Sequence, residues 1–308
     1  MSDRVLSVVV GGDEEAPATA DLVLGKYLLQ LRKQAGLTQK QVVDAGAFSS
    51  VSMLSKYEGG KVTVQEQAVI KLVKFLGIQD AEELDELRAL VGQARTKEWW
   101  SGFSDVVPGW LSRLFSMENS AHQIWTYQGN FVPGLLQTSD YARALMRAPY
   151  RRPGSDGVDL KAAKMIERRL TVRLQRQSLL DQANAPDLYV VLDENVLSRP
   201  TGGRSVMRGQ LRQLYNYGEN KSRVHIRVLP FSAAEFVTPL KTAMTLLKFA
   251  AGQGGDVVYI ECSNEGGTYE NEREPVERHK ASFEELWAHA MDKEASLKLL
   301  DVYANKLR

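Results

Sequence analysis

The amino-acid sequence predicts two domains of different class, an all-α N-terminal domain and a larger, mixed α/β C-terminal domain. A chain of 308 residues is long enough for about two domains of ordinary size. From residue 21 to residue 77, apolar residues recur at helical spacing and no strand is required. Beyond Trp99 and Trp100, helical stretches alternate with short β-branched runs, a pattern typical of an α/β or α+β domain. The expected strands are residues 187–193, 223–230, 243–250 and 256–261, and the expected helices are residues 205–217, 275–291 and 293–307.

The composition is that of a globular protein, with 44% hydrophobic and 25% charged residues and a net charge of +1. The single cysteine, Cys262, excludes an intrachain disulfide, and the four histidines lack zinc-ligand spacing. No apolar run is long enough to span a bilayer, and the first residues lack the pattern of a signal peptide. We therefore expect a cytoplasmic protein without a metal or cofactor.

Changes in composition divide the chain into four segments. Residues 1–20 are small and acidic and contain Gly11, Gly12 and Pro17, so they are expected to form a flexible tail. Residues 21–79 form the helical domain. Residues 80–98 are expected to form an acidic linker helix with leucines at 84, 87 and 90, and residues 99–308 form the second domain.

Residues 37–61 are expected to form two short helices joined by a tight turn. Thr38 can cap the first helix, and Gly46 stands where the chain must turn sharply. Ser49 or Ser50 then caps a second helix that runs to about residue 57. The side chains expected to point inward from the second helix are Tyr57 and either Met53 or Leu54.

The outer face of the second helix is short or polar, so the helix can enter a major groove about 12 Å wide and bring hydroxyls, a methyl-bearing side chain and an amine to base edges. Residues 21–79 carry eight Lys and Arg against four Asp and Glu, an excess that favours phosphate binding. Two helices packed for structural reasons alone remain the alternative. The candidate contacts with double-stranded DNA are Gln39, Lys40, Ser50, Val51, Ser52, Met53, Ser55, Lys56 and Lys61.

The segment "LGKYLLQLRKQAGLTQKQVVDAG", followed by "SSVSMLSKYEGGK", resembles the XRE-type helix-turn-helix regulators, which are related to phage repressors. This resemblance implies a five-helix, phage-repressor-like domain. The helix beginning at Ser50 would lie in the major groove, and Gln39 would touch phosphate or support a base contact. It also implies a homodimer on a palindromic operator, since one short recognition helix covers only a half-site. Such a regulator would be associated with the nucleoid.

The motifs "VPGLLQTSDYARAL", "LDENVLSRPTGG", "VHIRVLPF" and "VVYIE" occur in the order found in the C-terminal domain of actinobacterial, antitoxin-like XRE regulators. This resemblance covers nearly all of residues 99–305. It implies a domain classed mainly as of unknown function. Genes of that group often lie beside one for a small acidic protein, so the resemblance implies that this domain binds a small partner protein or a ligand.

Two surfaces are candidates for that binding. Gln137, Tyr141 and Arg143 form part of a cleft for a ligand or a partner's tail, or else they belong to a structural corner that docks a helix on the sheet. Residues 147–176 carry nine Lys and Arg against three Asp and Glu. Their helix, with Arg169 and Arg173, is either a solvated face or a patch that meets DNA or an acidic partner.

Catalysis has little support in the sequence. Asp193, Glu194 and Glu261 stand at the ends of expected strands, where carboxylates can be catalytic. No histidine or cysteine has a companion that suggests a nucleophile, and no glycine-rich phosphate loop precedes a helix. We expect a protein that is not an enzyme; the alternative is an enzymatic C-terminal domain that is tethered to DNA or regulated through the helix-turn-helix.

Overall fold

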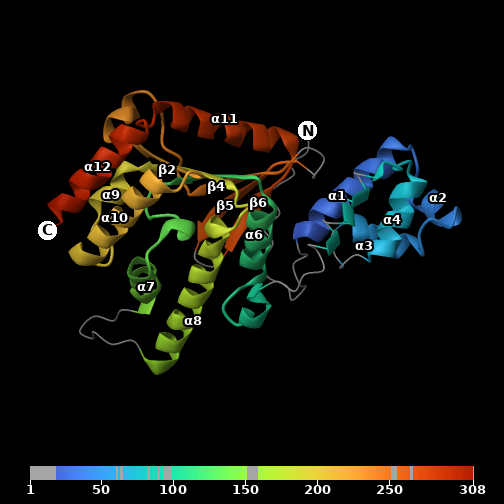
Figure 1. Cartoon of the computed structure of the whole chain (residues 1–308), viewed down its shortest axis with the longest axis horizontal. Coiled ribbons are helices and arrows are strands. Elements are labelled where there is room, and N and C mark those ends of the chain that lie inside the picture. The colour runs from blue at the N-terminus through green and yellow to red at the C-terminus, as the bar shows by residue number, and fades with distance from the viewer. Residues whose placement is uncertain are drawn as a thin grey trace, which may run out of the picture. The chain divides into compact units, whose positions relative to one another are not determined.

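The computed structural model describes residues 19–59, 62, 65–81, 84–85, 87–88, 91–92, 99–150, 159–250, 255–263 and 266–307. The chain divides into two compact units (Figure 1). One comprises Met1–Gly102, Pro108–Ser120 and Phe249–Gly255, and the other comprises Phe103–Val107, Ala121–Lys248 and Asp256–Arg308. The first is helical and the second contains a six-stranded mixed sheet, so the predicted fold class is confirmed. The tail predicted for residues 1–20 lies outside the described residues except for Thr19 and Ala20, and the domain boundaries remain predictions.

The first unit contains an apolar core formed by its N-terminal helices. Its helices are α1 (Thr19–Gln34), α2 (Gln39–Asp44), α3 (Val51–Glu58), α4 (Glu66–Phe75) and α6 (Gly109–Ser120), with a 3-10 turn η1 (Trp99–Phe103). Leu24 and Leu28 of α1, Leu54 of α3 and Leu72 of α4 are buried against one another. Residues 81, 84–85, 87–88 and 91–92 are also helical. Leu84, Leu87 and Val91 lie in the same core, so the segment predicted as a linker helix packs with the first unit.

Local signals in the sequence define the turn between α2 and α3. The Thr38 hydroxyl accepts the Gln41 backbone N–H at 3.2 Å while the Gln41 side chain accepts the Thr38 backbone N–H at 2.8 Å, which completes a capping box at the start of α2. Gly46 ends the helix in the left-handed region with φ +70°, as expected for a sharp turn. Ser50, rather than Ser49, caps α3 and accepts the Met53 backbone N–H at 3.2 Å.

A buried carboxylate links the first three helices. The Glu58 side chain accepts hydrogen bonds from Nε of Arg32 on α1 at 2.5 Å and from Nη2 at 2.8 Å. The amide nitrogen of Gln39, at the start of α2, donates to the same carboxylate at 2.8 Å. The Glu58 hydrogen bond raises the pKa of the Arg32 guanidinium above its ordinary value. Three helices therefore converge on one charged group that is almost fully withdrawn from water.

The second unit contains one sheet in the order β3-β2-β1-β4-β5-β6. Strands β1 (Gln123–Gln128), β2 (Asp187–Asp193) and β3 (Val224–Leu229) are parallel, whereas β4 (Met244–Lys248), β5 (Val257–Ser263) and β6 (Gly266–Glu270) are antiparallel. The predicted β-branched runs correspond to β2, β3, β4 and β5. Strands β1 and β6 were not predicted.

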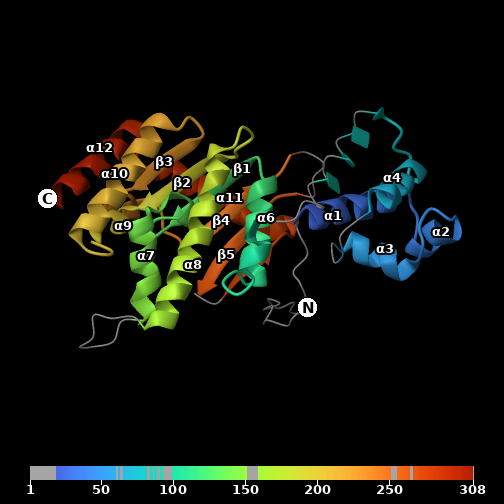
Figure 2. The same ribbon diagram turned by 60° about the horizontal axis from the view of Figure 1, so that its bottom comes forward.

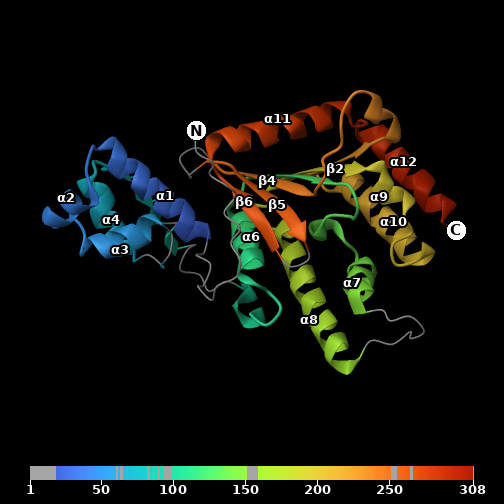
Figure 3. The ribbon, with the colours of Figure 1, turned by 180° about the vertical axis from the view of Figure 1, so that it is seen from behind.

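Helices cover both faces of this sheet. Helices α7 (Ser139–Arg147) and α8 (Leu160–Gln177) lie side by side on one face, and α11 (Arg273–His289) crosses the other (Figures 1 and 3). Under α11, Phe283 and Leu286 are buried against Tyr127 of β1 and Val191 of β2. The remaining helices of this unit are α9 (Glu194–Ser198), α10 (Arg204–Asn220) and α12 (Lys293–Lys306). Helix α10 lies beside α12 (Figure 2). The helices predicted at 205–217, 275–291 and 293–307 are thus confirmed as α10, α11 and α12.

The outer edge of β3 is covered by its own chain. The Ser296 hydroxyl on α12 accepts the Val228 backbone N–H at 3.0 Å, and the Met291 backbone N–H donates to the Val228 carbonyl at 2.9 Å. An edge strand with open backbone groups would offer a template for pairing with another chain. The α11–α12 connection and α12 satisfy part of that edge within the molecule.

Two neighbouring glycines of β6 provide a test of packing. A Cβ on Gly267 would overlap the ring of Tyr259, which is buried on β5, whereas a Cβ on Gly266 would meet nothing within 4 Å. Gly267→Ala should therefore lower the free energy of unfolding by about 1–3 kcal/mol, the usual loss for overpacking. Gly266→Ala is the matched control and should change it by less than about 0.5 kcal/mol. Urea unfolding of the full chain measures both, and equal losses would show that the Tyr259 ring does not restrict this position.

The linked helices provide a second test. Glu58→Ala removes one partner of a buried ion pair and leaves the Arg32 charge without it, so the first unit should lose about 3 kcal/mol of unfolding free energy. Glu58→Gln keeps an acceptor for Gln39 and should lose less. Ser55→Ala, an exposed change on the same helix, is the control and should cost under about 0.5 kcal/mol. Thermal unfolding followed by circular dichroism distinguishes the three, and a Glu58→Ala variant as stable as Ser55→Ala would refute a stabilising role for the pair.

Candidate nucleic-acid interface

Helix α3 divides into a buried and an exposed face. Leu54, Tyr57 and Glu58 are buried in the first unit. Phe48, in the turn before the helix, packs edge to face on Tyr57 with ring centroids 5.1 Å apart. Of the two residues considered for the inward position, Leu54 is buried and Met53 is exposed. The exposed face consists of Val51, Ser52, Met53, Ser55 and Lys56.

The start of α2 contributes two residues of different character. Lys40 is exposed, with its ammonium free to reach solvent or phosphate. Gln39 is half-buried, and its amide nitrogen is bound to Glu58 at 2.8 Å. Gln39 therefore orients α3 relative to α2, and one of its two amide N–H donors is used inside the unit. This is a positioning role, in addition to the phosphate or base contact expected from the sequence.

Most of the predicted DNA-contact residues are exposed to solvent. Lys40 of α2, the cap Ser50 and the five outward residues of α3 are exposed. The Ser50 hydroxyl is held by its capping bond to the Met53 N–H. Lys61 lies outside the described residues. Contact with DNA remains a prediction for each of these side chains.

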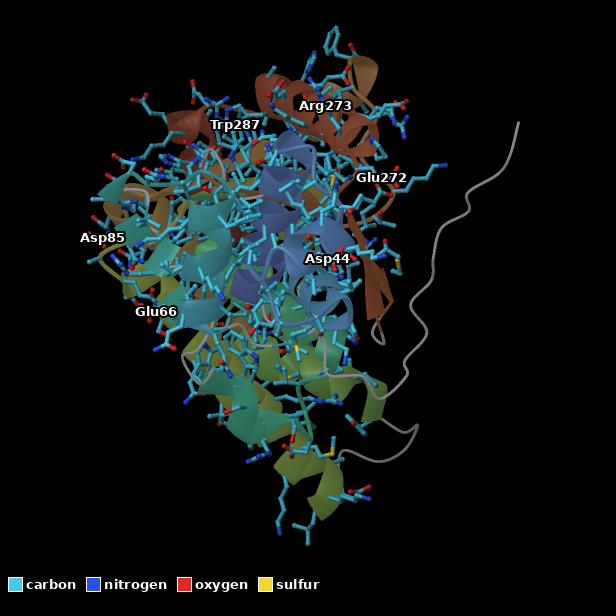
Figure 4. The ribbon with its side chains drawn as sticks, turned by 90° about the vertical axis from the view of Figure 1, so that its right-hand side faces the viewer. Asp44, Glu66, Asp85, Glu272, Arg273 and Trp287 are labelled. Carbon is cyan, nitrogen blue, oxygen red and sulfur yellow. The ribbon has the colours of Figure 1, made fainter. Side chains whose placement is uncertain are left out.

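Three carboxylates in the described part of the first unit, Glu58, Glu66 and Asp85, are paired with arginines. Glu58, the only acidic residue of α3, is buried and paired with Arg32. Glu66 and Asp85 lie on the same side of the unit (Figure 4). Both form ion pairs with Arg88, whose Nε is 3.9 Å from Oε1 of Glu66 and whose Nη1 is 2.5 Å from Oδ1 of Asp85. Asp44 ends α2 and is exposed. The outer face of α3 therefore carries one cation, Lys56, and no anion.

In the second unit, Gln137 and Tyr141 are buried rather than placed in an open cleft. Tyr141 is fully buried, which raises the pKa of its phenol, and its hydroxyl accepts the Val132 backbone N–H at 3.2 Å. The Gln137 amide donates to the Val132 carbonyl at 2.7 Å, and its oxygen accepts a hydrogen bond from Arg173 of α8. These contacts are those of the structural corner, the alternative left open by the sequence.

Amide side chains from two helices complete this corner. Gln177 of α8 donates to the carbonyls of Gly134 and Gln137, both at 2.8 Å. Gln210 of α10 accepts the Thr138 backbone N–H at 2.7 Å and donates to the Leu136 carbonyl at 2.8 Å. The irregular backbone between β1 and α7, which includes the 3-10 turn η2 (Gly134–Leu136), thus obtains the hydrogen bonds that a buried segment requires.

The remaining basic candidates lie on or beside α8. Arg143 of α7 forms two hydrogen bonds with Glu167 of α8, at 2.8 Å and 3.2 Å, and the first of these lowers the pKa of the Glu167 carboxyl. Arg173 is half-buried against Gln137. Arg169 is exposed, as are Lys161 and Lys164. Arg143 and Arg173 are therefore used within the fold, and Arg169 is on its surface.

The carboxylates considered for catalysis at the end of β2 accept hydrogen bonds from the fold. Asp193 caps α9 through the Asn195 N–H at 2.9 Å. Glu194 accepts the Phe231 N–H at 2.8 Å and the Tyr303 hydroxyl at 2.7 Å. Burial, with this hydrogen bond, raises the pKa of Tyr303 to about 12. Glu261 is exposed on β5.

The described residues contain no group of three or more His, Cys, Asp or Glu side chains placed to hold a metal ion. In the same part of the chain, no helix combines the length and apolar character needed to cross a membrane.

The pairing of Arg32 with Glu58 was not predicted from the sequence. Both residues belong to the motif that resembles the XRE-type regulators, but they are 26 positions apart. A pattern of helical periodicity places each residue on its own helix and does not show that the two helices bring them together. The available signal was a charged residue on the inward face of each helix, since buried charges are generally paired.

Comparison with family models agrees with this division. Residues 23–87 match a model described as a helix-turn-helix domain. Residues 111–302 match a model described as a domain of unknown function, DUF5753. Comparisons with curated proteins and with solved structures gave no match. The second match covers more than half of the chain, so the chain belongs to the DUF5753 family. A helix-turn-helix domain precedes the segment that defines that family.

Proposed function

We propose that this protein is a sequence-specific, DNA-binding transcription regulator that places α3 in the major groove of double-stranded DNA. The observation that carries the proposal is the outer face of α3, which is exposed, consists of short, polar or flexible side chains and has no carboxylate. An α-helix with such side chains fits a groove about 12 Å wide and can bring them to the base edges. The match to a helix-turn-helix model supports the same role.

The roles of the individual side chains follow from their positions. Residues in the N-terminal part of a recognition helix reach base edges, so Val51, Ser52, Met53 and Ser55 are proposed to contact bases. Lys40 and Lys56 are proposed to contact phosphate or a base, because an ammonium gains from counterion release at the DNA backbone. Gln39 holds α3 through Glu58 and is proposed to support these contacts.

We propose that two copies bind together. One α3 of eight residues reads only a half-site, and a two-fold operator presents its half-sites about 34 Å apart. A homodimer on a palindromic operator satisfies both conditions. As a regulator of transcription the dimer would act at the nucleoid.

For the second unit we propose binding of a small partner protein or a ligand, as in the antitoxin-like actinobacterial regulators that its motifs resemble. Exposed cations on α8, Lys161, Lys164 and Arg169, support an acidic partner. We propose no catalytic role, since Asp193 and Glu194 already accept hydrogen bonds from backbone and tyrosine groups of the fold.

DNA binding is tested by footprinting and gel retardation on the sequence upstream of the gene. Lys56→Ala should weaken binding to all duplexes and reduce the slope of log affinity against log salt concentration by about one, because one phosphate contact is lost. Lys74→Ala, an exposed lysine at the end of α4, is the matched control and should leave the slope unchanged. An unchanged slope for Lys56→Ala would remove Lys56 from the phosphate contacts, and no retardation at low salt would oppose DNA binding itself.

The partner is tested with the small acidic protein encoded beside the gene. Mixing the two should give a complex that elutes early in size-exclusion chromatography. Lys161→Glu combined with Lys164→Glu reverses two charges on α8 and should abolish the complex at physiological salt. Lys298→Glu, an exposed lysine of α12, is the control and should bind as the wild type does. Separate elution of the wild-type proteins would favour a small-ligand sensor instead.

A further inference from the structure

Two apolar side chains stand out on the exposed face of α3. Val51 is 41% exposed and Met53 is 39% exposed, and both lie on α3 among the polar residues of its outer face. They are two positions apart, so they lie about 200° apart around the helix axis, on opposite flanks of Ser52.

Apart from lysine, which Lys56 supplies, the side chains that most often read bases through hydrogen bonds are absent from this face. Arginine reads guanine through two hydrogen bonds, and asparagine or glutamine reads adenine in the same way. Helix α3, Val51–Glu58, contains none of the three. The nearby amide of Gln39 donates to Glu58, and the hydroxyl of Ser50 is engaged in capping the helix. Hydroxyls of Ser52 and Ser55 and the ammonium of Lys56 remain as polar readers.

The chemistry of this face matches one feature of the major groove. Among the bases, only thymine presents an apolar group there, the C5-methyl, and apolar side chains contact it. Covering Val51 and Met53 with thymine methyl groups would remove apolar surface of both molecules from water, which is favourable. A guanine or cytosine at the same place would offer polar atoms that neither side chain can satisfy.

We infer that Val51 and Met53 recognise thymine methyl groups at two separate base pairs, one on each side of the Ser52 contact, in every half-site. This inference rests on the proposed insertion of α3 into the major groove, and it names the class of operator: half-sites that contain thymine at both positions. Each methyl contact should contribute about fourfold in affinity, the value of one buried methylene group. Together they should contribute about 15-fold.

The test begins with selection of binding sites by the full-length chain from a library of random duplexes. In the best selected duplex, each thymine is then replaced singly by deoxyuridine, which lacks the methyl group and keeps the same base pairing. Replacement at two positions of each half-site should weaken binding about fourfold each. In Val51→Ala the loss at one of these positions should disappear, and in Met53→Ala the loss at the other should disappear.

Exposed apolar residues elsewhere provide the control. Phe75→Ala, at the end of α4, removes a side chain that is 44% exposed, and it should keep both deoxyuridine effects. Because all three positions are exposed, circular dichroism should show each variant folded.

The outcomes distinguish a failure of sequence-specific DNA binding from a failure of methyl recognition. If no sequence is enriched, the proposed function fails and the inference with it. If a sequence is enriched but deoxyuridine at every thymine changes affinity by less than twofold, the regulator stands and methyl recognition is overturned. A change in oligomeric state on Val51→Ala, with unchanged deoxyuridine effects, would assign this residue to a protein contact and overturn its role as a reader.

Discussion

The ion pair between Arg32 and Glu58 is the interaction on which the first unit depends. It joins α1 to the end of α3, and Gln39 adds the start of α2 to the same carboxylate. A carboxylate this far from water is tolerated only when its lone pairs are satisfied, so the geometry of the three helices is constrained together. As a result, α3 is held with Leu54 and Tyr57 inward and with Val51, Ser52, Met53, Ser55 and Lys56 outward. The buried contacts of Glu58 thus determine which residues of α3 form the surface that is proposed to read DNA.

Much of this arrangement was predictable, because its signals are local. Thr38 and Ser50 cap helices through their own side chains within three residues, and Gly46 adopts a backbone conformation that other residues rarely accept. The division of α3 into two faces follows from a period of 3.6 residues. The pairing of Arg32 with Glu58 was not predictable in this way, since it depends on how α1 and α3 pack rather than on either helix alone.

The strands of the sheet also differ in how far they could be predicted from the sequence. Strand β2, "DLYVVLD", is a continuous apolar run that indicates a buried parallel strand, and it was predicted. Strand β1, "QIWTYQ", lies in the middle of the same sheet, yet its glutamines and threonine obscure the pattern. The Thr126 hydroxyl is buried there and donates to the Met244 carbonyl at 3.1 Å, a partner 118 residues away. Strand β6, "GGTYE", is a half-exposed edge whose glycines weaken any strand signal.

The corner between β1 and α7 has a consequence for the behaviour of the second unit in acid and alkali. Its irregular backbone is bonded by the carboxamides of Gln137, Gln177 and Gln210. A carboxamide neither gains nor loses a proton between strongly acidic and strongly alkaline solution, whereas a carboxylate in the same place would change its charge near neutrality if buried. The amide bonding of this corner is therefore insensitive to the acidity of the surrounding solution, unlike the pair between Arg143 of α7 and Glu167 of α8, whose carboxylate can gain a proton.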